Sequence, residues 1–521
     1  MTEKVKILGP PGCGKTYTLM AKYASLLNDG YKVEDITCTT FRRSSANDLI
    51  TKVKEWTEES QPLKDHVNSL HSICYRLLGG KSYAEVIQPT EIRQFAKDCG
   101  YETYLKNATI TSVSDDDESV YSGELLDLYT WLRNTRTPVE KWYRYPGADN
   151  VILPASKVPD FIVDYERYKQ KIGRIDFSDM IEHVIQEQTP LDTPVLMVDE
   201  FQDLTRQQFD LFSMWVKGCE SVTIAGDPLQ SIYGFWGGSP DYFNEWKGKE
   251  IIRNVSHRLK TPVWKLATEI LRAERQRAPE VETSPGNSKS ISCVLHGEEL
   301  PTNHASELHL VRCNYQAPAI AMKLAQSGRI FGGLCGWSES EINLFNTLLK
   351  ARAEAPLLSR DMLTLVENYP DKYFKHPGKK ADFVEYLKND YRPTLAAMNL
   401  CIKLELYNVI NSNTPAAYIP NCGNLKSEKI NNAINKHPKP ISPDDLQQCQ
   451  ILTIHGAKGL EADTVYLHTG ITPRVKKALV IPGEESESEA RVWYVGVTRA
   501  KHHLCLVRDS GYNYQLPGVV A

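Results

Sequence analysis

The sequence lacks three features that would place it in a specialised class of protein. No apolar run in its 521 residues approaches the roughly 18–20 residues needed to cross a bilayer, which excludes a membrane-spanning helix. Its twelve cysteines form no C-x-x-C pair, which argues against a zinc site or a disulfide framework and for a reducing compartment. Its net charge is only −4, so any contact with nucleic acid has to be local, along a groove.

The N-terminus leaves no room for a signal peptide, because Met1–Lys4 is followed almost at once by a glycine-rich loop. We therefore expect an intracellular, cytoplasmic protein with no membrane partner, and a nucleoid or viral replication context is compatible with this. The hydrophobic share of 41% and the charged share of 24% are ordinary for a globular protein. The length suggests about three or four folding units.

The glycine-rich loop is the first motif that carries chemistry, and it consists of Gly9, Pro10, Pro11, Gly12, Cys13, Gly14, Lys15 and Thr16. Residues 5–8 before it are β-prone, and residues 16–27 after it have apolar side chains at helical spacing. Between a strand and a helix this pattern binds a nucleoside triphosphate, because glycine lets successive N–H groups point at the phosphates. Lys15 would then reach the β- and γ-phosphates, and the Thr16 hydroxyl would bind Mg²⁺. A plain glycine turn is the structural alternative.

A second motif follows a strand predicted at residues 195–198. Four apolar residues there indicate a buried parallel strand, and Asp199 and Glu200 come directly after it. Ligands bind at the carboxyl edge of such a sheet. Asp199 can hold Mg²⁺ there, and Glu200 can orient or deprotonate an attacking water. An exposed Asp-Glu pair without chemistry is the alternative, and the buried strand argues against it.

Aromatic residues in two further places are candidates for stacking on bases. Gln230 lies in the glycine-rich loop 226–238 with three aromatic residues after it, which suits a γ-phosphate sensor joined to a stacking platform. Phe41 ends a strand predicted at residues 35–41, where it could either stack on a base or be buried. His71, taken alone, is a helix cap or a packed side chain rather than a contact.

The pattern of strands and helices predicts two α/β domains, each interrupted by a mainly helical insert. Helical segments rich in Tyr and Trp indicate the first insert, and Pro and Asn breaks with basic clusters indicate the second. In order, the first domain comprises residues 1–88 and 171–252, its insert residues 89–170, the second domain residues 253–350 and 445–521, and its insert residues 351–444.

Nine segments in this order resemble the motifs of the UvrD/Rep-like branch of superfamily 1 DNA helicases. They are residues 9–16, 40–41, 71–72, 199–203, 226–238, 258, 312–314, 453–461 and 494–501. The series covers both ends of the chain and most of its middle, so it is far more specific than any single motif. The resemblance implies two RecA-like P-loop domains, with parallel sheets flanked by helices, ATP in the cleft between them, and single-stranded DNA across both.

The resemblance also implies roles for individual residues. The catalytic set would be Lys15, Glu200, Gln230, Arg258 and Arg499, with Arg258 and Arg499 lent by the second domain to the γ-phosphate. Glu461 matches the position that holds the ribose. The positions that match DNA-contacting residues of the family are Thr40, Phe41, His71, Tyr233, Phe235 and His455. For Arg258 and Arg499 individually, a surface salt bridge is the alternative.

The sequence departs from the family pattern at three positions. Only eight residues precede Gly9, so the family's upstream segment with an adenine-reading glutamine is absent, and His257 replaces the tyrosine that stacks on the base. ATP is still the expected fuel. Phe235-Trp236 stands where the family often has Trp-Arg, which keeps a stacking ring and loses a charge. The second insert is also smaller than in the large bacterial helicases.

These observations favour an ATP- and Mg²⁺-dependent DNA helicase or translocase. It would move along single-stranded DNA, 3′→5′ by the resemblance, and open duplex at junctions of single- and double-stranded DNA. Two alternatives stay open. One is a DNA-stimulated NTPase that strips proteins from DNA or serves a nuclease, and the other is a nucleotide-switched DNA-binding scaffold. Protein partners from replication, repair or nuclease pathways are not specified by the sequence.

Overall fold

The structure of the protein is a computed structural model that describes residues 2–40, 43–54, 61–79, 86–105, 109–111, 120–122, 124–286, 290–295, 306–355, 357–374, 379–388, 411–419, 422–480 and 482–517. By packing, the chain divides into two compact units. The first comprises residues 1–290, 474–499 and 516–521, and the second comprises residues 291–473 and 500–515.

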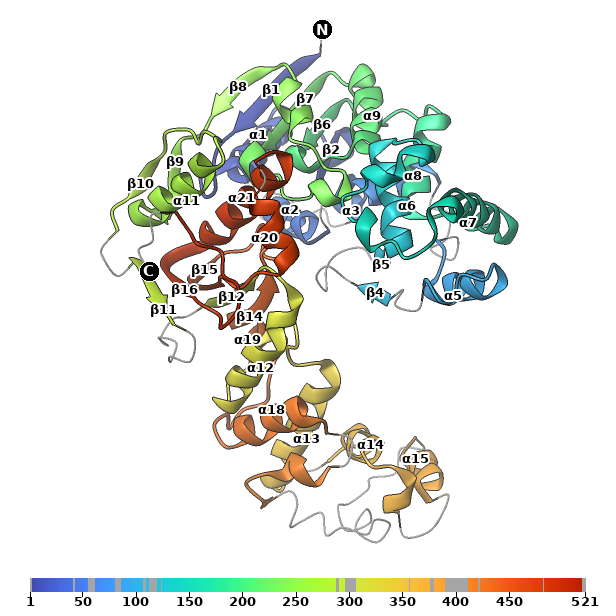
Figure 1. The fold of residues 1–521 in the computed structure, drawn as a ribbon, viewed down its shortest axis with the longest axis vertical. Coiled ribbons are helices and arrows are strands. Elements are labelled where there is room, and N and C mark those ends of the chain that lie inside the picture. The colour runs from blue at the N-terminus through green and yellow to red at the C-terminus, as the bar shows by residue number, and fades with distance from the viewer. Residues whose placement is uncertain are drawn as a thin grey trace. The chain divides into compact units, whose positions relative to one another are not determined.

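The first unit is built on a parallel six-stranded sheet (Figure 1). In sheet order the strands are β3 (Val67–Ser69), β2 (Ile36–Thr40), β6 (Val195–Val198), β7 (Ser221–Gly226), β1 (Glu3–Leu8) and β8 (Lys249–Ile252). The helices that flank it are α1 (Lys15–Asn28), α2 (Arg43–Lys54), α3 (Gln61–His66), α4 (Leu70–Leu77), α8 (Phe177–Gln186), α9 (Arg206–Trp215) and α10 (Asp241–Glu245).

Strand β6 shows why this sheet is covered on both faces. Successive side chains of a strand point to opposite faces. Val195 and Met197 pack in the core that includes α1, whereas Leu196 and Val198 pack in the core that includes α4, α8 and α9. All four residues are buried, so the strand reads as one continuous apolar run, as a central parallel strand requires.

A largely helical region is inserted between β3 and β6 of the first unit. It contains α5 (Pro89–Asp98), α6 (Glu124–Thr135), α7 (Val158–Ile172) and a two-stranded antiparallel pair, β4 (Thr109–Thr111) and β5 (Val120–Ser122). Its core is aromatic. Phe95 packs against Phe161 and Tyr165 with ring centroids 5.9 and 5.3 Å apart.

A buried ionic cluster joins this region to α8. Lys169 of α7 is 1% exposed, and its Nζ lies 2.7 Å from Asp176 Oδ2 and 2.5 Å from Asp179 Oδ2. Burial alone would lower the pKa of Lys169, but the charges of Asp176 and Asp179 outweigh it and raise that pKa. Asp176 also caps α8 by accepting a hydrogen bond from Asp179 N. The cluster therefore fixes α7 against the beginning of α8.

The remainder of the first unit combines residues 253–290 with residues 474–499, which lie far apart in the sequence. β9 (Val255–Lys260) and β10 (Glu282–Ser284) form a short parallel pair. The helices of this part are α11 (Thr261–Ala273), α20 (Pro473–Val480) and α21 (Glu484–Val497). α11 packs on α21, with the rings of Trp264 and Tyr494 6.2 Å apart. This packing brings the segment before Arg499 to the segment after Arg258.

The second unit has its own parallel six-stranded sheet. In sheet order its strands are β11 (Ile291–Val294), β16 (Ala500–Val507), β15 (Ala462–His468), β12 (Glu307–Val311), β14 (Cys449–Thr453) and β13 (Gly332–Gly333). Its described helices are α12 (Ala317–Gln326), α13 (Glu339–Arg352), α14 (Ser359–Glu367), α15 (Lys379–Lys388), α18 (Asn424–Ile434) and α19 (Pro443–Gln448). Residues of α12, α13, α14, α15 and α18 share one apolar core.

The predicted fold class is confirmed: the protein is α/β, with two parallel sheets flanked by helices. The predicted domain boundaries stay a prediction. The packing division assigns residues 253–290 and 474–499 to the unit of the first sheet, whereas the sequence analysis assigned them to the second domain. Among the described helices, none has both the length and the apolar character that a membrane span needs.

Candidate functional site

The glycine-rich loop lies between β1 and α1 and is backed by β9. Gly12 and Gly14 have φ of 74° and 76°, the left-handed region that glycine adopts without strain. A Cβ added to Gly12 would lie 2.5 Å from the Cβ of Arg258, so only glycine lets β9 come this close. Ser256 Oγ donates to the carbonyl of Pro11 at 2.9 Å. The loop is therefore held from behind by the strand that carries Arg258.

Lys15 and Thr16 begin helix α1 directly after this loop. Lys15 is 8% exposed, and its Nζ donates to the carbonyl oxygen of Pro10 at 3.4 Å. Thr16 Oγ1 donates to Asp199 Oδ2 at 2.8 Å, across 183 positions of sequence. A hydroxyl and a carboxylate side by side form a hard oxygen donor set, which fits Mg²⁺. The structure thus brings together the two residues predicted to hold the metal.

The environment of Asp199 disfavours its charge. Burial and then the neighbouring Glu200 raise the pKa of Asp199 to about 6, although the hydrogen bond from Thr16 and the charge of Lys15 act the other way. A cation placed beside a carboxylate whose pKa is raised in this way would stabilise its charged form. The electrostatics of the β6 edge therefore agree with a metal site.

Glu200 has an unusual backbone and a side chain held by an amide. Its φ is 53°, a left-handed conformation that strains a residue with a Cβ. Gln202 Nε2 donates to Glu200 Oε2 at 2.5 Å, while Gln202 Oε1 accepts from the backbone N of Asp227 at 2.9 Å. Gln202 is fully buried. The side chain of Gln202 therefore connects the predicted general base, Glu200, to the backbone just after β7.

Gln230 and Arg499 meet in the same region. Asp227 begins the turn after β7, and its Oδ2 accepts from Gln230 Nε2 at 2.8 Å. Gln230 Oε1 in turn accepts from Arg499 Nη2 at 3.0 Å. Arg499 is 1% exposed and follows α21. The amide of Gln230 is therefore oriented from both of its ends.

Arg258 approaches the same segment from β9. Its Nη1 lies 3.5 Å from the carbonyl oxygen of Thr498, the residue before Arg499. Thr498 is itself buried and donates to the carbonyl of Tyr494 at 2.8 Å. All five predicted catalytic residues belong to the first unit. They lie on segments that contact the phosphate loop or the loop after β7.

Two family profiles match the chain. The N-terminal domain of UvrD/REP helicases matches residues 1–250, and the C-terminal domain of UvrD-like helicases matches residues 339–510. The chain belongs to the UvrD/Rep helicase family. The resemblance expected from the sequence is confirmed.

Several named relatives are similar over nearly the whole chain. The ATP-dependent DNA helicase UvrD2 of Mycobacterium tuberculosis is 24% identical over 96% of this chain and 76% of its own length. A probable DNA helicase II homolog of Mycoplasma pneumoniae is 22% identical over 98% of this chain and 82% of its own. The ATP-dependent DNA helicase Rep of Salmonella typhimurium is 20% identical over 97% and 88%.

The positions predicted to touch DNA in this UvrD/Rep family member are distributed over both units. Thr40 ends β2, where its hydroxyl is buried and has no hydrogen-bond partner among the described residues. His71 lies on α4, with its ring 5.6 Å from that of Phe177. Tyr233 is buried, but Phe235 is 42% exposed. These DNA roles stay predictions, and Phe41 lies outside the described residues.

Two predicted residues lie in the second unit. Glu461 follows β14 and its carboxylate pairs with Lys501 at 2.9 Å. His455 is half-buried in the turn after β14. The roles predicted for both, in holding the ribose and in contacting DNA, stay predictions.

Sequence reasoning missed Gln202 and Ser256. Gln202 lies in the Asp199–Asp203 motif, so its proximity to Glu200 was readable, but the second bond to Asp227 depends on the neighbouring strand. Ser256 lies two residues before Arg258 with no local signal, and only the folded chain places it under the phosphate loop.

Proposed function

We propose that this chain hydrolyses ATP with Mg²⁺ and uses the energy to move 3′→5′ along single-stranded DNA and open duplex. The proposal rests on its family and on one geometric observation. The Thr16–Asp199 pair and the Gln230–Arg499 pair join four segments that are far apart in sequence. Such an arrangement suits a phosphate-transfer site, where catalysis is positioning and charge stabilisation rather than covalent chemistry.

In this proposal each residue has one task. The N–H groups of the loop at Gly9–Thr16 and the ammonium of Lys15 bind the phosphates. Thr16 and Asp199 would hold Mg²⁺, which supplies charge neutralisation when bound. Glu200 orients the attacking water and accepts its proton.

Gln230, Arg258 and Arg499 form the second half of the machinery. The amide of Gln230 responds to the γ-phosphate, and the two guanidinium groups stabilise the charge that develops on it. Arginines in this role are worth about 10³–10⁵ in rate.

The link from nucleotide to DNA runs through the loop after β7. Gln230 and the exposed ring of Phe235 belong to this loop, five positions apart, and Asn134 of α6 donates to the carbonyl oxygen of Trp236 at 3.0 Å. A base stacked on Phe235 would therefore bias the same loop that senses the phosphate. Hydrolysis and strand position are coupled in this way.

A hydrolysis assay with and without single-stranded DNA tests the proposal. We expect ATP hydrolysis that DNA stimulates, and loss of that activity in Lys15→Ala and Glu200→Gln. The same assay with GTP in place of ATP tests which nucleotide the protein hydrolyses. Hydrolysis at the parent rate in Lys15→Ala would contradict the assignment of the phosphate loop.

Strand displacement tests direction and unwinding. A duplex with a 3′ single-stranded tail should be opened and one with a 5′ tail should not. DNA-stimulated hydrolysis without displacement of either duplex would favour a translocase that removes proteins from DNA or an NTPase that serves a nuclease.

A further inference from the structure

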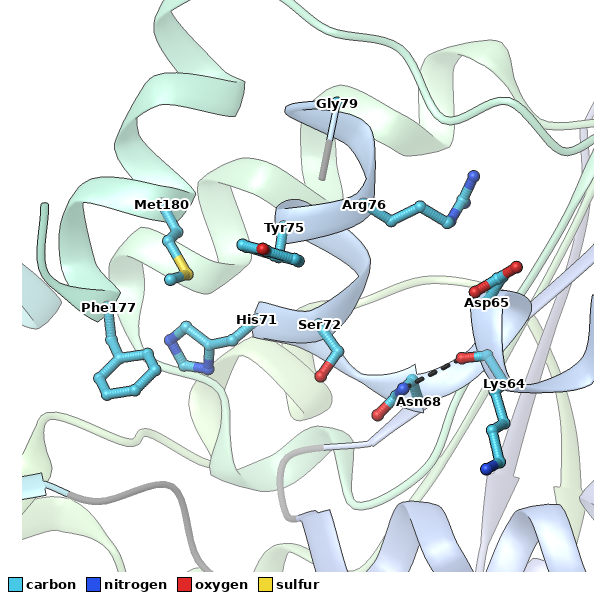
Figure 2. A pocket seen from close by; sticks show the side chains of 10 residues that line it. All are labelled: Lys64, Asp65, Asn68, His71, Ser72, Tyr75, Arg76, Gly79, Phe177 and Met180. Carbon is cyan, nitrogen blue, oxygen red and sulfur yellow. Dashed lines mark hydrogen bonds between the residues drawn. The ribbon is translucent and has the colours of Figure 1, made fainter. Parts of the chain in front are cut away.

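A cavity of about 520 Å³ lies in the first unit beside β3, between the end of α3, α4 and the beginning of α8 (Figure 2). Two of its polar side chains are already engaged by the protein. Asn68 Nδ2 donates to the carbonyl of Lys64 at 3.0 Å, and Arg76 pairs through both of its terminal nitrogens with Asp192. The second unit, by contrast, contains a buried polar group that the protein leaves without a partner.

Three side chains in the interior of the second unit differ in chemistry from the apolar core around them. Glu307 and His309 lie on β12, and Cys449 is the first residue of β14. Their exposed fractions are 2%, 1% and 2%. A carboxylate oxygen, a ring nitrogen and the thiol sulfur of the three residues all lie within 4.8 Å of one another. The three groups therefore face one small buried space.

The register of the sheet explains how they meet. β12 and β14 are parallel neighbours, and Glu307 pairs in register with Cys449, so the two side chains stand on the same face. His309 lies two positions after Glu307 and shares that face. The absence of C-x-x-C pairs argues only against metal sites whose ligands are close in sequence. Here the ligands come from two strands that are far apart in the chain.

His309 has one nitrogen engaged and one unpaired. Its Nδ1 lies 3.4 Å from Nε2 of His468, and its ring stacks on Tyr466 with centroids 4.5 Å apart. Its Nε2 is buried and has no hydrogen-bond partner among the described residues. A buried acceptor without a partner is unfavourable. Donation from Nδ1–H to His468 leaves the lone pair on Nε2, which is the usual arrangement of a histidine that binds a metal ion.

Glu307 is held in place by a second residue. Its Oε2 lies 2.7 Å from Nη2 of Arg329, and ligating carboxylates are usually supported in this way. The same guanidinium repels a further cation. A metal ion here therefore needs both anionic ligands, the carboxylate of Glu307 and the thiolate of Cys449, and this need favours a metal with affinity for sulfur.

A thiolate, an imidazole and a carboxylate are the ligand types of zinc, whereas Mg²⁺ and Ca²⁺ take oxygen ligands. Around a tetrahedral zinc ion the ligand atoms lie about 3.3–3.8 Å apart, so shifts of about 1 Å close the site. We propose that Glu307, His309 Nε2 and Cys449 bind one Zn²⁺ ion, with water as the fourth ligand. Binding forms a zinc–sulfur bond and releases the thiol proton of Cys449 to solvent. The ion would tie β12 to β14.

Cobalt titration of the parent chain tests the proposal without any variant. The intact chain, free of affinity tags and stripped of metal with a chelator, is titrated with Co²⁺ in excess Mg²⁺, which competes for the oxygen site at Thr16 and Asp199. One equivalent of Co²⁺ should give the intense visible bands of a four-coordinate ion and a thiolate-to-cobalt charge-transfer band in the near ultraviolet. Zn²⁺ should then abolish both. A spectrum without the charge-transfer band would overturn the proposal.

Substitution of the thiol assigns the sulfur. Cys449→Ser should lose the charge-transfer band and weaken Zn²⁺ binding by more than about 100-fold, because losing a group that merely supports a ligand already costs about 10- to 100-fold. Competition with a chromogenic chelator measures the affinity. Cys219→Ser removes another buried thiol, one that donates to the carbonyl of Trp215, and should keep the parent's band and affinity. A band that persists in Cys449→Ser would place the metal elsewhere and refute the site.

Substitution of the imidazole assigns the nitrogen. His309→Gln should also weaken Zn²⁺ binding by more than about 100-fold. His502→Gln changes a histidine of the second unit whose side chain is 62% exposed, and should bind as the parent does. Equal affinities of His309→Gln and His502→Gln for Zn²⁺ would contradict the role of His309.

Unfolding of the parent gives a further readout. At free Zn²⁺ of 100 times its Kd, the equilibrium constant for unfolding of the second unit should fall about 100-fold. Mg²⁺ at the same concentration should leave it unchanged. If Cys449→Ser does not fold, the cobalt spectrum and the unfolding of the parent still decide the question. None of these measurements depends on DNA-stimulated hydrolysis, so the zinc site and the proposed function stand or fall separately.

Discussion

The guanidinium of Arg499 donates a hydrogen bond from Nη2 to Oε1 of Gln230, 3.0 Å away and 269 positions earlier in the sequence. The contact is buried, and it leaves the amide of Gln230 bonded at both ends, to Arg499 and to Asp227. A substitution of Arg499 or of Gln230 therefore disrupts the same series of hydrogen bonds, which runs from Arg499 through Gln230 to Asp227.

Arg499→Ala should lower the kcat of DNA-stimulated hydrolysis by about 10³-fold or more. Combining it with Gln230→Ala should cost less than the product of the two single losses, because the two residues act through one contact. Arg272→Ala, at a position whose side chain is 74% exposed, is the control and should hydrolyse at the parent rate. Strictly multiplicative losses would contradict a shared role.

Gln202→Leu should lower kcat by about 10- to 150-fold, because a hydrogen bond to a charged group contributes about 1.5–3 kcal/mol. The KM for ATP should change little, since Gln202 bonds to Glu200 and to Asp227 N rather than to the phosphate loop. Gln207→Leu is a matched control, because Gln207 is equally buried but donates to the carbonyl of Ser178 at 3.0 Å. Steady-state kinetics that show a raised KM with unchanged kcat would rule out this positioning role.

Thr16→Val should raise the Mg²⁺ concentration needed for half-maximal hydrolysis by about tenfold or more, a cost typical of lost support at a metal site. The substitution removes the hydroxyl that lies 2.8 Å from Asp199 Oδ2 but keeps the shape of the side chain. Thr16→Ser retains the hydroxyl and should keep the parent's Mg²⁺ dependence. A titration with Mg²⁺ at saturating ATP measures both, and equal curves for valine and serine would count against the metal assignment.

Lys169→Met should lower the free energy of unfolding of the first unit by about 3–5 kcal/mol, because it leaves buried carboxylates without their cation. Asp176 and Asp179 lie 2.7 and 2.5 Å from the ammonium that is lost. Lys157→Met removes a pair with Asp160 whose side chains are 64% and 59% exposed, and should cost less than about 1 kcal/mol. Urea unfolding followed by tryptophan fluorescence distinguishes the two, and equal costs would show that the buried cluster contributes no more than a surface pair.

The stability of the second unit should fall as the pH decreases below about 6.5, the ordinary pKa of histidine. Burial, followed by the charge of Lys323, lowers the pKa of His468 to about 3. Between these two values the unfolded chain binds a proton that the folded chain does not. Each such proton costs up to about 1.4 kcal/mol per pH unit.

His468→Gln tests this assignment, because it removes the proton uptake and keeps a group that can bond to His309, whose Nδ1 lies 3.4 Å from His468 Nε2. The variant should lose less stability than the parent when urea unfolding is compared at pH 7.5 and 5.5. His502→Gln changes a histidine whose side chain is 62% exposed and serves as the control. A variant whose stability falls as steeply as the parent's would refute the assignment.

Much of the fold was readable from local pattern. The four apolar residues before Asp199 predicted a buried parallel strand, and β6 is one. The alternation of strands and helices predicted the two parallel sheets. The predicted strand at residues 35–41 corresponds to β2, which ends at Thr40. These features depend on the spacing of apolar side chains over a few neighbouring residues, and that spacing can be seen in the sequence itself.

The candidate site was readable only in part. Four of its residues lie at the end of a strand or the start of a helix that the sequence pattern predicts, namely Lys15, Thr16, Asp199 and Glu200. Their mutual geometry was not readable, because the hydrogen bond between Thr16 and Asp199 exists only once β1 and β6 lie in one sheet. The cavity beside β3 had no signal in the sequence, since its walls come from α3, α4 and α8.

The sequence by itself determined the phosphate loop, the carboxylates after β6 and the family, because short-range spacing and the order of motifs carry that information. The tertiary structure alone decided which distant groups touch. Gln230 meets Arg499 because α11 packs on α21 and the loop after β7 folds toward it, and Gln202 reaches Asp227 because β6 and β7 are neighbours. Such contacts depend on how apolar faces pack in three dimensions, which no local pattern of residues encodes.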